Sequence, residues 1–192
     1  RVSHLRQHDA DISLSKKMFE AVEKVLPQTD LLIFADFNYG CLPQALVDRV
    51  IDAAARRGIY MVADSQASSQ VSDIARFEGM KLITPTEREA RLALRDHNSG
   101  LAVVAEALRK KAHADNVVIT LGAEGLLVHA RNPSDWITDQ LPTFNTVPKD
   151  TAGAGDSFLT CAALALCSGM DIWRSAYLGS IAAACQVSRV GN

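Results

Sequence analysis

The sequence predicts a single-domain α/β protein whose mostly parallel sheet is covered by helices on both faces. Short, continuous apolar runs such as Leu31–Ala35 and Val117–Thr120 have the length and composition of strands buried on both faces. Amphipathic segments of about a dozen residues alternate with these runs. This alternation is typical of βαβ units, in which a helix connects two parallel strands.

The first half of the chain alternates expected strands with expected helices. Apolar residues recur at helical spacing after Ser15 and after Pro43, and proline is favoured at the first position of a helix. Gly58 is a natural C-terminal cap, because glycine readily adopts the left-handed conformation. In order, we expect a strand at Val2–Arg6, a helix at Ser15–Leu26, a strand at Leu31–Ala35, a helix from Pro43 to Gly58, and strands at Ile59–Ala63 and Lys81–Thr84.

The second half begins with two helices and ends with two more. The turn Leu121–Gly125 leads from one strand-like run into another, so it predicts a hairpin and not a strand-to-helix phosphate loop. The last helix is apolar all round and is therefore expected to be buried. In order, we expect helices at Glu87–Arg95 and Leu101–His113, strands at Val117–Thr120, Leu126–Ala130 and Trp136–Leu141, and helices at Ala154–Ser168 and Ile172–Val187.

Composition narrows the function classes. The 192 residues carry a formal net charge of -2, and the basic surface of a nucleic-acid-binding protein is not expected. No apolar run has the length of a membrane span, and the first residues show no signal-peptide pattern. The four cysteines lack metal-binding spacing, which fits free thiols in a reducing, cytoplasmic setting.

The stretch Lys149–Phe158 has the pattern of an anion-binding helix start. Gly153 and Gly155 tolerate backbone angles closed to other residues, and the unpaired N–H groups of a helix's first turn bind phosphate. Asp156 lies in that first turn, where a hydroxyl nucleophile would need a proton acceptor. A Walker A loop is excluded because the chain contains no Gly-Lys pair, and the third glycine of a dinucleotide fingerprint is replaced by Phe158.

Five segments are expected at one edge of the sheet. Ligands of open α/β sheets bind beyond the carboxyl ends of the strands, and polar or glycine residues follow the predicted strands there. Asp36 or Asp64 alone would be explained as an ordinary turn residue, because aspartate is common in turns. The segments are Asp36–Gly40, Asp64–Gln66, Thr84–Glu89, Thr120–Gly125 and Asp150–Asp156.

Residues Asp150–Asp156 resemble the D-T-x-G-A-G-D signature of the ribokinase-like (PfkB) carbohydrate kinases at all six fixed positions. The resemblance implies a three-layer α/β/α fold and ATP-dependent phosphorylation of a sugar hydroxyl. Asp156 would be the catalytic base, and the backbone of Gly153, Ala154 and Gly155 would receive the charge of the transferring phosphate. Asp150 and Thr151 would lie on the nucleotide side.

Three weaker matches extend the resemblance over residues 31–192. Thr120, Gly122 and Gly125 match a T-x-G-x-x-G turn that holds the nucleotide in this family. Residues 84–89 resemble a P-N-x-x-E segment, which makes Glu89 the expected Mg²⁺ residue. Residues 36–40 resemble the D-Y-x-K-G loop of the heptose-phosphate kinase branch, which implies a substrate-side role for Asp36 and Asn38.

The resemblance also sets expectations for the whole protein. A family member carries a preceding segment that forms a small β lid, so residues 1–192 are expected to be the nucleotide-binding core of a longer kinase. ATP and Mg²⁺ are the implied cofactors, with a monovalent cation as a further candidate. A small-molecule sugar is the implied partner, with no nucleic acid and no membrane, and a homodimer would form through the lid.

Three departures from the family pattern keep other functions open. Thr86 replaces the asparagine of P-N-x-x-E, Tyr39 replaces the lysine of D-Y-x-K-G, and Ser65-Gln66 replaces a Pro-Lys pair. All three changes remove groups expected near phosphates or metal, which favours a non-catalytic nucleotide-binding domain as an alternative. A nucleoside kinase of the same fold is another alternative. A Rossmann-type oxidoreductase is disfavoured, because no G-x-G-x-x-G joins a strand to a helix.

Overall fold

The computed structural model describes residues 8–66, 73–132 and 135–190. Within these ranges the chain forms a six-stranded sheet in the order β1-β2-β3-β4-β5-β6. The first four strands are parallel, and the last two are antiparallel to their neighbours. The predicted mostly parallel sheet is therefore confirmed. The strands are β1 (Leu31–Asp36), β2 (Tyr60–Ser65), β3 (Leu82–Ile83), β4 (Asn116–Thr120), β5 (Leu126–Asn132) and β6 (Asp135–Leu141).

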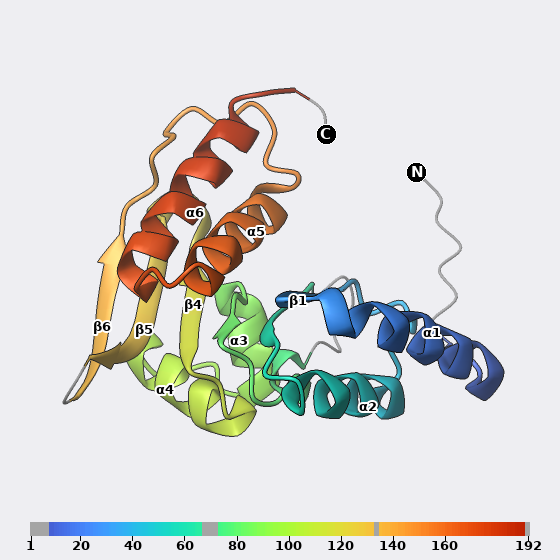
Figure 1. The fold of residues 1–192 in the computed structure, drawn as a ribbon. Helices are drawn as coiled ribbons and strands as arrows, with labels where there is room; N and C mark the ends of the chain where they lie inside the picture. The colour runs from blue at the N-terminus through green and yellow to red at the C-terminus, as the bar shows by residue number, and fades with distance from the viewer. Residues whose placement is uncertain (1–7, 67–72, 133–134, 191–192) are drawn as a thin grey trace.

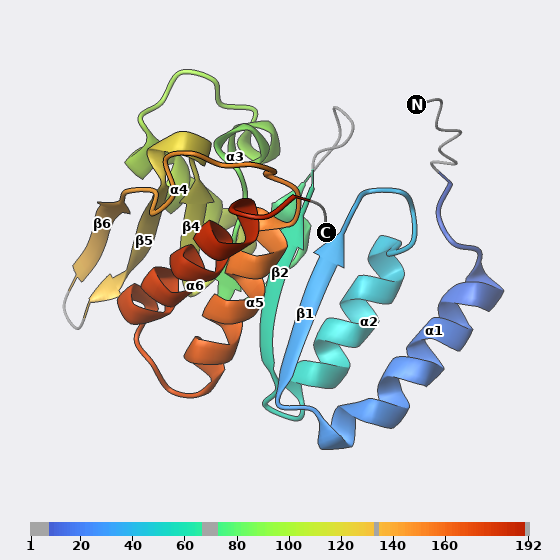
Figure 2. The same cartoon turned by 90° about the horizontal axis from the view of Figure 1, so that it is seen from above.

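Helices cover both faces of the sheet, as Figures 1 and 2 show. One face is covered by α1 (Ile12–Val25), α2 (Gln44–Ala55), α3 (Glu87–Leu94) and α4 (Leu101–Ala112). The other face is covered by α5 (Ala154–Cys167) and α6 (Ile172–Val187), which pack against each other. Short 3₁₀ turns lie at Leu26–Gln28 (η1), Ile74–Arg76 (η2) and Gly122–Glu124 (η3).

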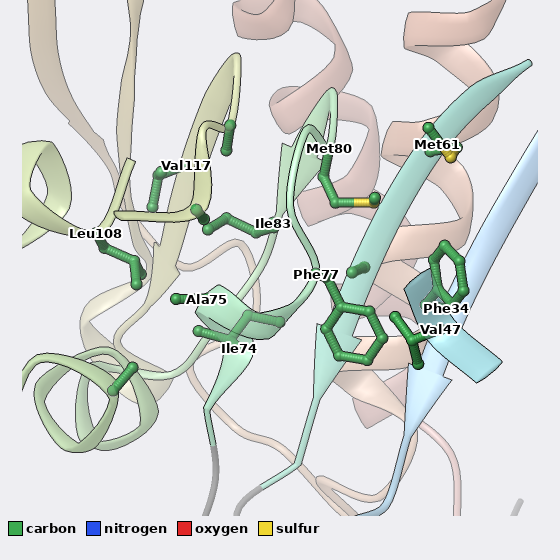
Figure 3. Packing of buried hydrophobic residues seen from close by; sticks show 14 of the residues in the cluster. Phe34, Val47, Met61, Ile74, Ala75, Phe77, Met80, Ile83, Leu108 and Val117 are labelled. Carbon is green, nitrogen blue, oxygen red and sulfur yellow. The ribbon is translucent and has the colours of Figure 1, made fainter. Parts of the chain in front are cut away.

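The strands divide the hydrophobic core into two clusters, because successive side chains of a strand point to opposite faces. Ala63 and Ile83 face the α1–α4 side, whereas their neighbours Val62 and Leu82 face α5 and α6. Figure 3 shows the first cluster, in which Phe77 packs against Phe34 with 5.2 Å between the ring centroids. This rigid sheet holds the loops at its carboxyl edge in place.

The observed elements follow the predicted ones with shifted ends. Helix α1 begins at Ile12, three residues before the predicted start, because the Asp11 carboxylate accepts a hydrogen bond from the Leu14 N–H at 2.8 Å and caps the helix. The predicted hairpin after β4 is confirmed by the antiparallel pairing of β4 and β5. The strand expected at Val2–Arg6 lies outside the described residues.

The prediction that the last helix is buried all round is wrong on one face. In α6 the side chains of Tyr177 and Ile181 are 50% and 40% exposed, while Ile172 and Ala176 are buried. The helix has a sheet on one side only, so its apolar character does not make it central. In the part of the chain that the structure describes, no helix is both long and apolar enough to cross a membrane.

Candidate functional site

The N-terminus of α5 is open toward ligands. Gly153 adopts a left-handed conformation with φ of 74°, and no side chain caps the helix. The Asp150 carboxylate accepts a hydrogen bond from the Ala152 N–H at 3.0 Å, which shapes the turn before the helix. The N–H groups of the first turn have no intrahelical acceptors. Together with the positive end of the helix dipole, they form a site suited to phosphate.

A cavity of about 1370 Å³ lies in front of this helix end. It opens at the edge where the parallel strands end, and the connection between β6 and α5, orange in Figure 2, crosses that edge. The structure brings nine of the predicted site residues to its wall. They are Glu89, Thr120, Gly122, Gly125, Thr151, Gly153, Ala154, Gly155 and Asp156.

Three carboxylates from different elements approach one another at the cavity. Asp64 is the penultimate residue of β2, Glu89 lies in the first turn of α3, and Asp156 lies in the first turn of α5. Asp64 is only 9% exposed. Burial, together with the negative charges of Glu89 and Asp156, raises the pKa of its carboxyl group to about 7. The cavity wall therefore carries negative charge that a bound cation would compensate.

Glu89 is held by a capping box. Its carboxylate accepts a hydrogen bond from the Thr86 N–H at 2.7 Å, and the Thr86 hydroxyl accepts one from the Glu89 N–H at 3.3 Å. Thr86 therefore has a local structural role that explains a hydroxyl at this position. Thr86 also pairs with Thr120 through an isolated parallel bridge, which fixes the start of α3 beside the end of β4.

The donor set at this edge fits Mg²⁺, which prefers carboxylate oxygens and keeps several of its waters. Among the described residues, no three acidic, histidine or cysteine side chains converge closely enough to hold one ion directly. A Mg²⁺ ion here would therefore be bound partly through water. Glu89 and Asp64 are the candidates to hold such an ion, because both residues line the cavity and their charges interact.

The two glycines of the turn after β4 are required for different structural reasons. A Cβ at Gly125 would fall on the Leu141 carbonyl oxygen and lie 2.8 Å from the Thr143 nitrogen, so a neighbouring chain segment requires glycine there. Gly122 has φ of 61°, and a Cβ there would meet nothing within 4 Å. Its glycine is explained by the turn conformation alone.

Asp36 and Asn38 are not brought to the cavity wall. The buried Asp36 carboxylate forms an ion pair with Arg76 at 2.7 Å. The Asn38 amide donates hydrogen bonds to the Ser65 hydroxyl at 3.0 Å and to the Gln66 carbonyl oxygen at 2.6 Å. Asn38 thus ties the loop after β1 to the loop after β2. Asp150 also lies outside the wall, and the roles of all three residues in binding stay predictions.

Sequence reasoning missed two parts of the site. The segment Asp64–Gln66 was expected at this edge of the sheet, but Asp64 itself was assigned no role in the site, because an aspartate taken alone is explained as a turn residue. The second part is residues 142–146 and Pro148, which line the cavity together with Ala183, Ala184 and Val187 of α6. The Asn145 amide donates a hydrogen bond to the Ala184 carbonyl oxygen at 3.2 Å, so this segment packs directly against α6. Nothing in the local sequence identifies this segment, because only folding brings it across the edge of the sheet.

The chain is similar in sequence to curated proteins named HldE. Bifunctional protein HldE of Helicobacter hepaticus is 28% identical over 196 residues, which cover 100% of this chain and 39% of that protein. The HldE protein of Geobacter metallireducens is 32% identical over 167 residues, 85% of this chain and 32% of that protein. The chain thus spans about two fifths or less of the relatives it matches.

Solved structures of low sequence identity share the fold. Phosphofructokinase-2 from Escherichia coli in complex with potassium superposes with a TM-score of 0.75 at 19% identity, covering 92% of this chain and 57% of that one. Ribokinase from Arabidopsis thaliana complexed with ribose and ATP gives a TM-score of 0.71 at 17% identity, covering 91% of this chain and 54% of that one. The predicted ribokinase-like α/β fold is therefore confirmed.

The family match rests on nearly the whole chain. Residues 6–192 match the pfkB family of carbohydrate kinases, a range that contains the glycine-rich turn, the three carboxylates and every described strand. This chain belongs to the pfkB carbohydrate kinase family.

Proposed function

We infer that this chain is the catalytic core of an ATP-dependent kinase that phosphorylates a sugar hydroxyl. The observation that carries the proposal is the position of Asp156. Its exposed carboxylate lies on the cavity wall in the first turn of α5, beside backbone N–H groups suited to a phosphate. A proton acceptor and an anion site thus lie side by side, as phosphoryl transfer to a hydroxyl requires.

In the proposed reaction, the acceptor oxygen attacks the γ-phosphorus of ATP. A new bond forms between this oxygen and the phosphorus, the bond to the β–γ bridging oxygen breaks, and ADP leaves. The hydroxyl proton goes to the Asp156 carboxylate. The N–H groups of Gly153, Gly155 and Asp156 at the start of α5 stabilise the charge on the transferring phosphoryl oxygens, whereas the Ala152 N–H holds the turn by donating to the Asp150 carboxylate. Asp150 and Thr151 shape the turn that presents these groups.

The cavity offers a complementary place for the nucleotide. Its apolar part, formed by Pro142, Phe144, Ala183, Ala184 and Val187, suits an adenine ring. The turn with Thr120, Gly122 and Gly125 lines the same cavity. Glu89 and Asp64 would hold Mg²⁺, which supplies positive charge to the triphosphate when bound. A monovalent cation stays a further candidate, since phosphofructokinase-2 was solved with potassium.

For the acceptor we propose a sugar phosphate related to heptose phosphate. Support comes from the HldE relatives and from the residue 36–40 loop, whose Asp36 and Asn38 remain candidates for substrate-side contacts. The chain covers 57% of phosphofructokinase-2 and less of the HldE relatives, which supports residues 1–192 as one domain of a longer kinase. A homodimer through a lid segment stays a prediction.

The test is Asp156→Asn in the full-length protein. We expect kcat to fall by about 10²-fold or more, the usual contribution of a general base, while ATP affinity changes little. Asp139→Asn is a matched control, because Asp139 is exposed on β6 and its carboxylate accepts a hydrogen bond from the neighbouring Gln140 N–H at 2.8 Å. Near-normal turnover of Asp156→Asn would refute the base assignment. A wild-type protein that binds ATP but never turns over would favour the non-catalytic alternative.

A further inference from the structure

Arg88 is a cation on the cavity wall that has no polar partner among the described residues. It is the second residue of α3, its side chain is exposed, and it lines the cavity. It forms no hydrogen bond or ion pair with any residue that the structure describes. The other arginine of the wall, Arg91, is engaged, because it pairs with Glu87 at 2.8 Å and donates to the Ser99 carbonyl oxygen at 3.0 Å.

Local helix stability does not explain a cation at this position. The N-terminus of a helix carries partial positive charge, so acidic residues stabilise the first turn and basic residues destabilise it. Glu87 and Glu89 follow that rule, and Arg88 between them breaks it. The residue four positions after Arg88 is Leu92, which cannot form the ion pair that would compensate this cost. A residue that breaks a local rule without a local gain is a candidate for function.

The charges on the cavity wall suggest a role for Arg88 in binding an anion. Four carboxylates line the wall, those of Asp64, Glu87, Glu89 and Asp156. The positive charge of Arg91 is paired with Glu87. A triphosphate entering this wall is repelled unless cations offset the carboxylates. The lysines of the family loops are replaced by Tyr39 and Gln66, so those segments supply no cation. Arg88 is the arginine left to meet an incoming phosphate.

The surroundings of Arg88 favour the nucleotide over the sugar acceptor. The start of α3 is fixed beside β4 by the Thr86–Thr120 bridge and by the Thr120 N–H bond to the Pro85 carbonyl oxygen at 2.9 Å. Thr120 begins the turn assigned to the nucleotide. The loops assigned to the acceptor follow β1 and β2, which lie beyond β3 in the sheet.

We propose that Arg88 binds the β- or γ-phosphate of the nucleotide and thereby positions the triphosphate against the N-terminus of α5. This inference rests on the proposed kinase function. The planar guanidinium donates two parallel hydrogen bonds to phosphate oxygens and keeps its charge at any working pH.

Equilibrium binding to the full-length protein tests the proposal without turnover. The probes are the non-hydrolysable ATP analogue AMP-PNP with Mg²⁺, and adenosine, which lacks phosphate. Arg88→Gln should weaken AMP-PNP binding by about tenfold to a hundredfold, the usual effect of losing a charged hydrogen bond, and leave adenosine binding unchanged. Arg88→Lys should fall between wild type and Arg88→Gln, because it keeps the charge and loses the paired geometry.

Arg56→Gln is the matched control, since Arg56 is an exposed arginine at the C-terminal end of α2, which leads into the opposite edge of the sheet. Unchanged AMP-PNP affinity in Arg88→Gln would overturn the inference and leave the proposed function standing. An equal loss of adenosine binding would also overturn it, because the effect would not depend on phosphate. A wild-type protein that binds neither probe would refute the proposed function itself.

Discussion

Asp64 shows at the scale of one residue how the fold creates unusual chemistry. The position at the end of β2 buries the carboxyl group to 9% exposure, and the Thr84 hydroxyl approaches it at 3.5 Å. Burial is the main cause of its raised pKa, and the carboxylates of Glu89 and Asp156 add repulsion. The sequence alone shows only an aspartate after a strand, because repulsion among residues 64, 89 and 156 exists only after folding.

The raised pKa predicts a pH dependence of stability. Folded Asp64 keeps its proton up to about pH 7, whereas in the unfolded chain it loses the proton near the ordinary value of 3.8. The folded state therefore binds the extra proton between these values, and the free energy of unfolding falls as pH rises through this window. The fall is about 4 kcal/mol in total and is complete above pH 7.

Asp64→Asn should remove this fall and raise the free energy of unfolding at pH 8. Urea unfolding at pH 4.5 and pH 8, with a chelator present to keep metals away, measures it. Asp52→Asn, an exposed position on α2, serves as the control and should follow the wild type. Parallel pH profiles for wild type and Asp64→Asn would contradict the assignment.

Glu89→Gln separates the charge of Glu89 from its capping role. Glutamine at the third helical position can still accept the hydrogen bond from the Thr86 N–H, so the folded state should be no less stable. The lost charge should raise the Mg²⁺ concentration for half-maximal activity by about tenfold or more, which a magnesium titration of the full-length enzyme measures. Thr86→Asn should match wild type, because asparagine is an equally good N-cap. Three superimposable titration curves would defeat the role of Glu89.

At the scale of elements, the hairpin β4–β5 shows that a residue of the nucleotide motif can be required by packing within the protein. Gly125 was expected to admit the nucleotide, but the atoms a side chain would strike belong to residues 141–143. The segment after β6 therefore packs closely against this turn, and both line the cavity. A substitution at Gly125 is therefore expected to change the stability of the fold, whether or not it also changes nucleotide binding.

Gly125→Ala should destabilise the protein by more than about 2 kcal/mol, because the Cβ overlaps backbone atoms and the residue keeps a positive φ of 92°. Gly122→Ala is the matched control. It should cost only about 1 kcal/mol, since its strain comes from φ alone. Thermal or urea unfolding measures both changes. Equal losses at the two positions would show that the contact with residues 141–143 is unimportant.

Elements with strong periodic patterns were predictable, and their ends were predictable only where a cap is visible in the sequence. The six expected strands from Leu31 onward and the helices appear in the predicted order. The early start of α1 depends on the Asp11 cap, and the exposed face of α6 depends on its place at the outside of the molecule. The hydrophobicity of a helix indicates that it packs against other elements, but it does not indicate on how many sides.

At the scale of the whole molecule, the site is built from residues far apart in the chain. Asp64, Glu89, Thr120 and Asp156 belong to four elements, and the parallel sheet brings the ends of these elements to one edge. Motifs identified the turns at Thr120 and Asp150. The contribution of residues 142–146 and Pro148 to the cavity wall could not be predicted, because it depends on the path of a connection without regular structure.

The central claim is that the protein transfers the γ-phosphate of ATP to a sugar hydroxyl. The direct measurement is ADP release by the full-length protein with Mg²⁺ and a panel of sugars, sugar phosphates and nucleosides, with ³¹P NMR of the product. We predict ADP release that depends on a sugar or sugar phosphate, together with one new phosphate ester on that compound. ATP binding without acceptor-dependent ADP release from any member of the panel would contradict the claim.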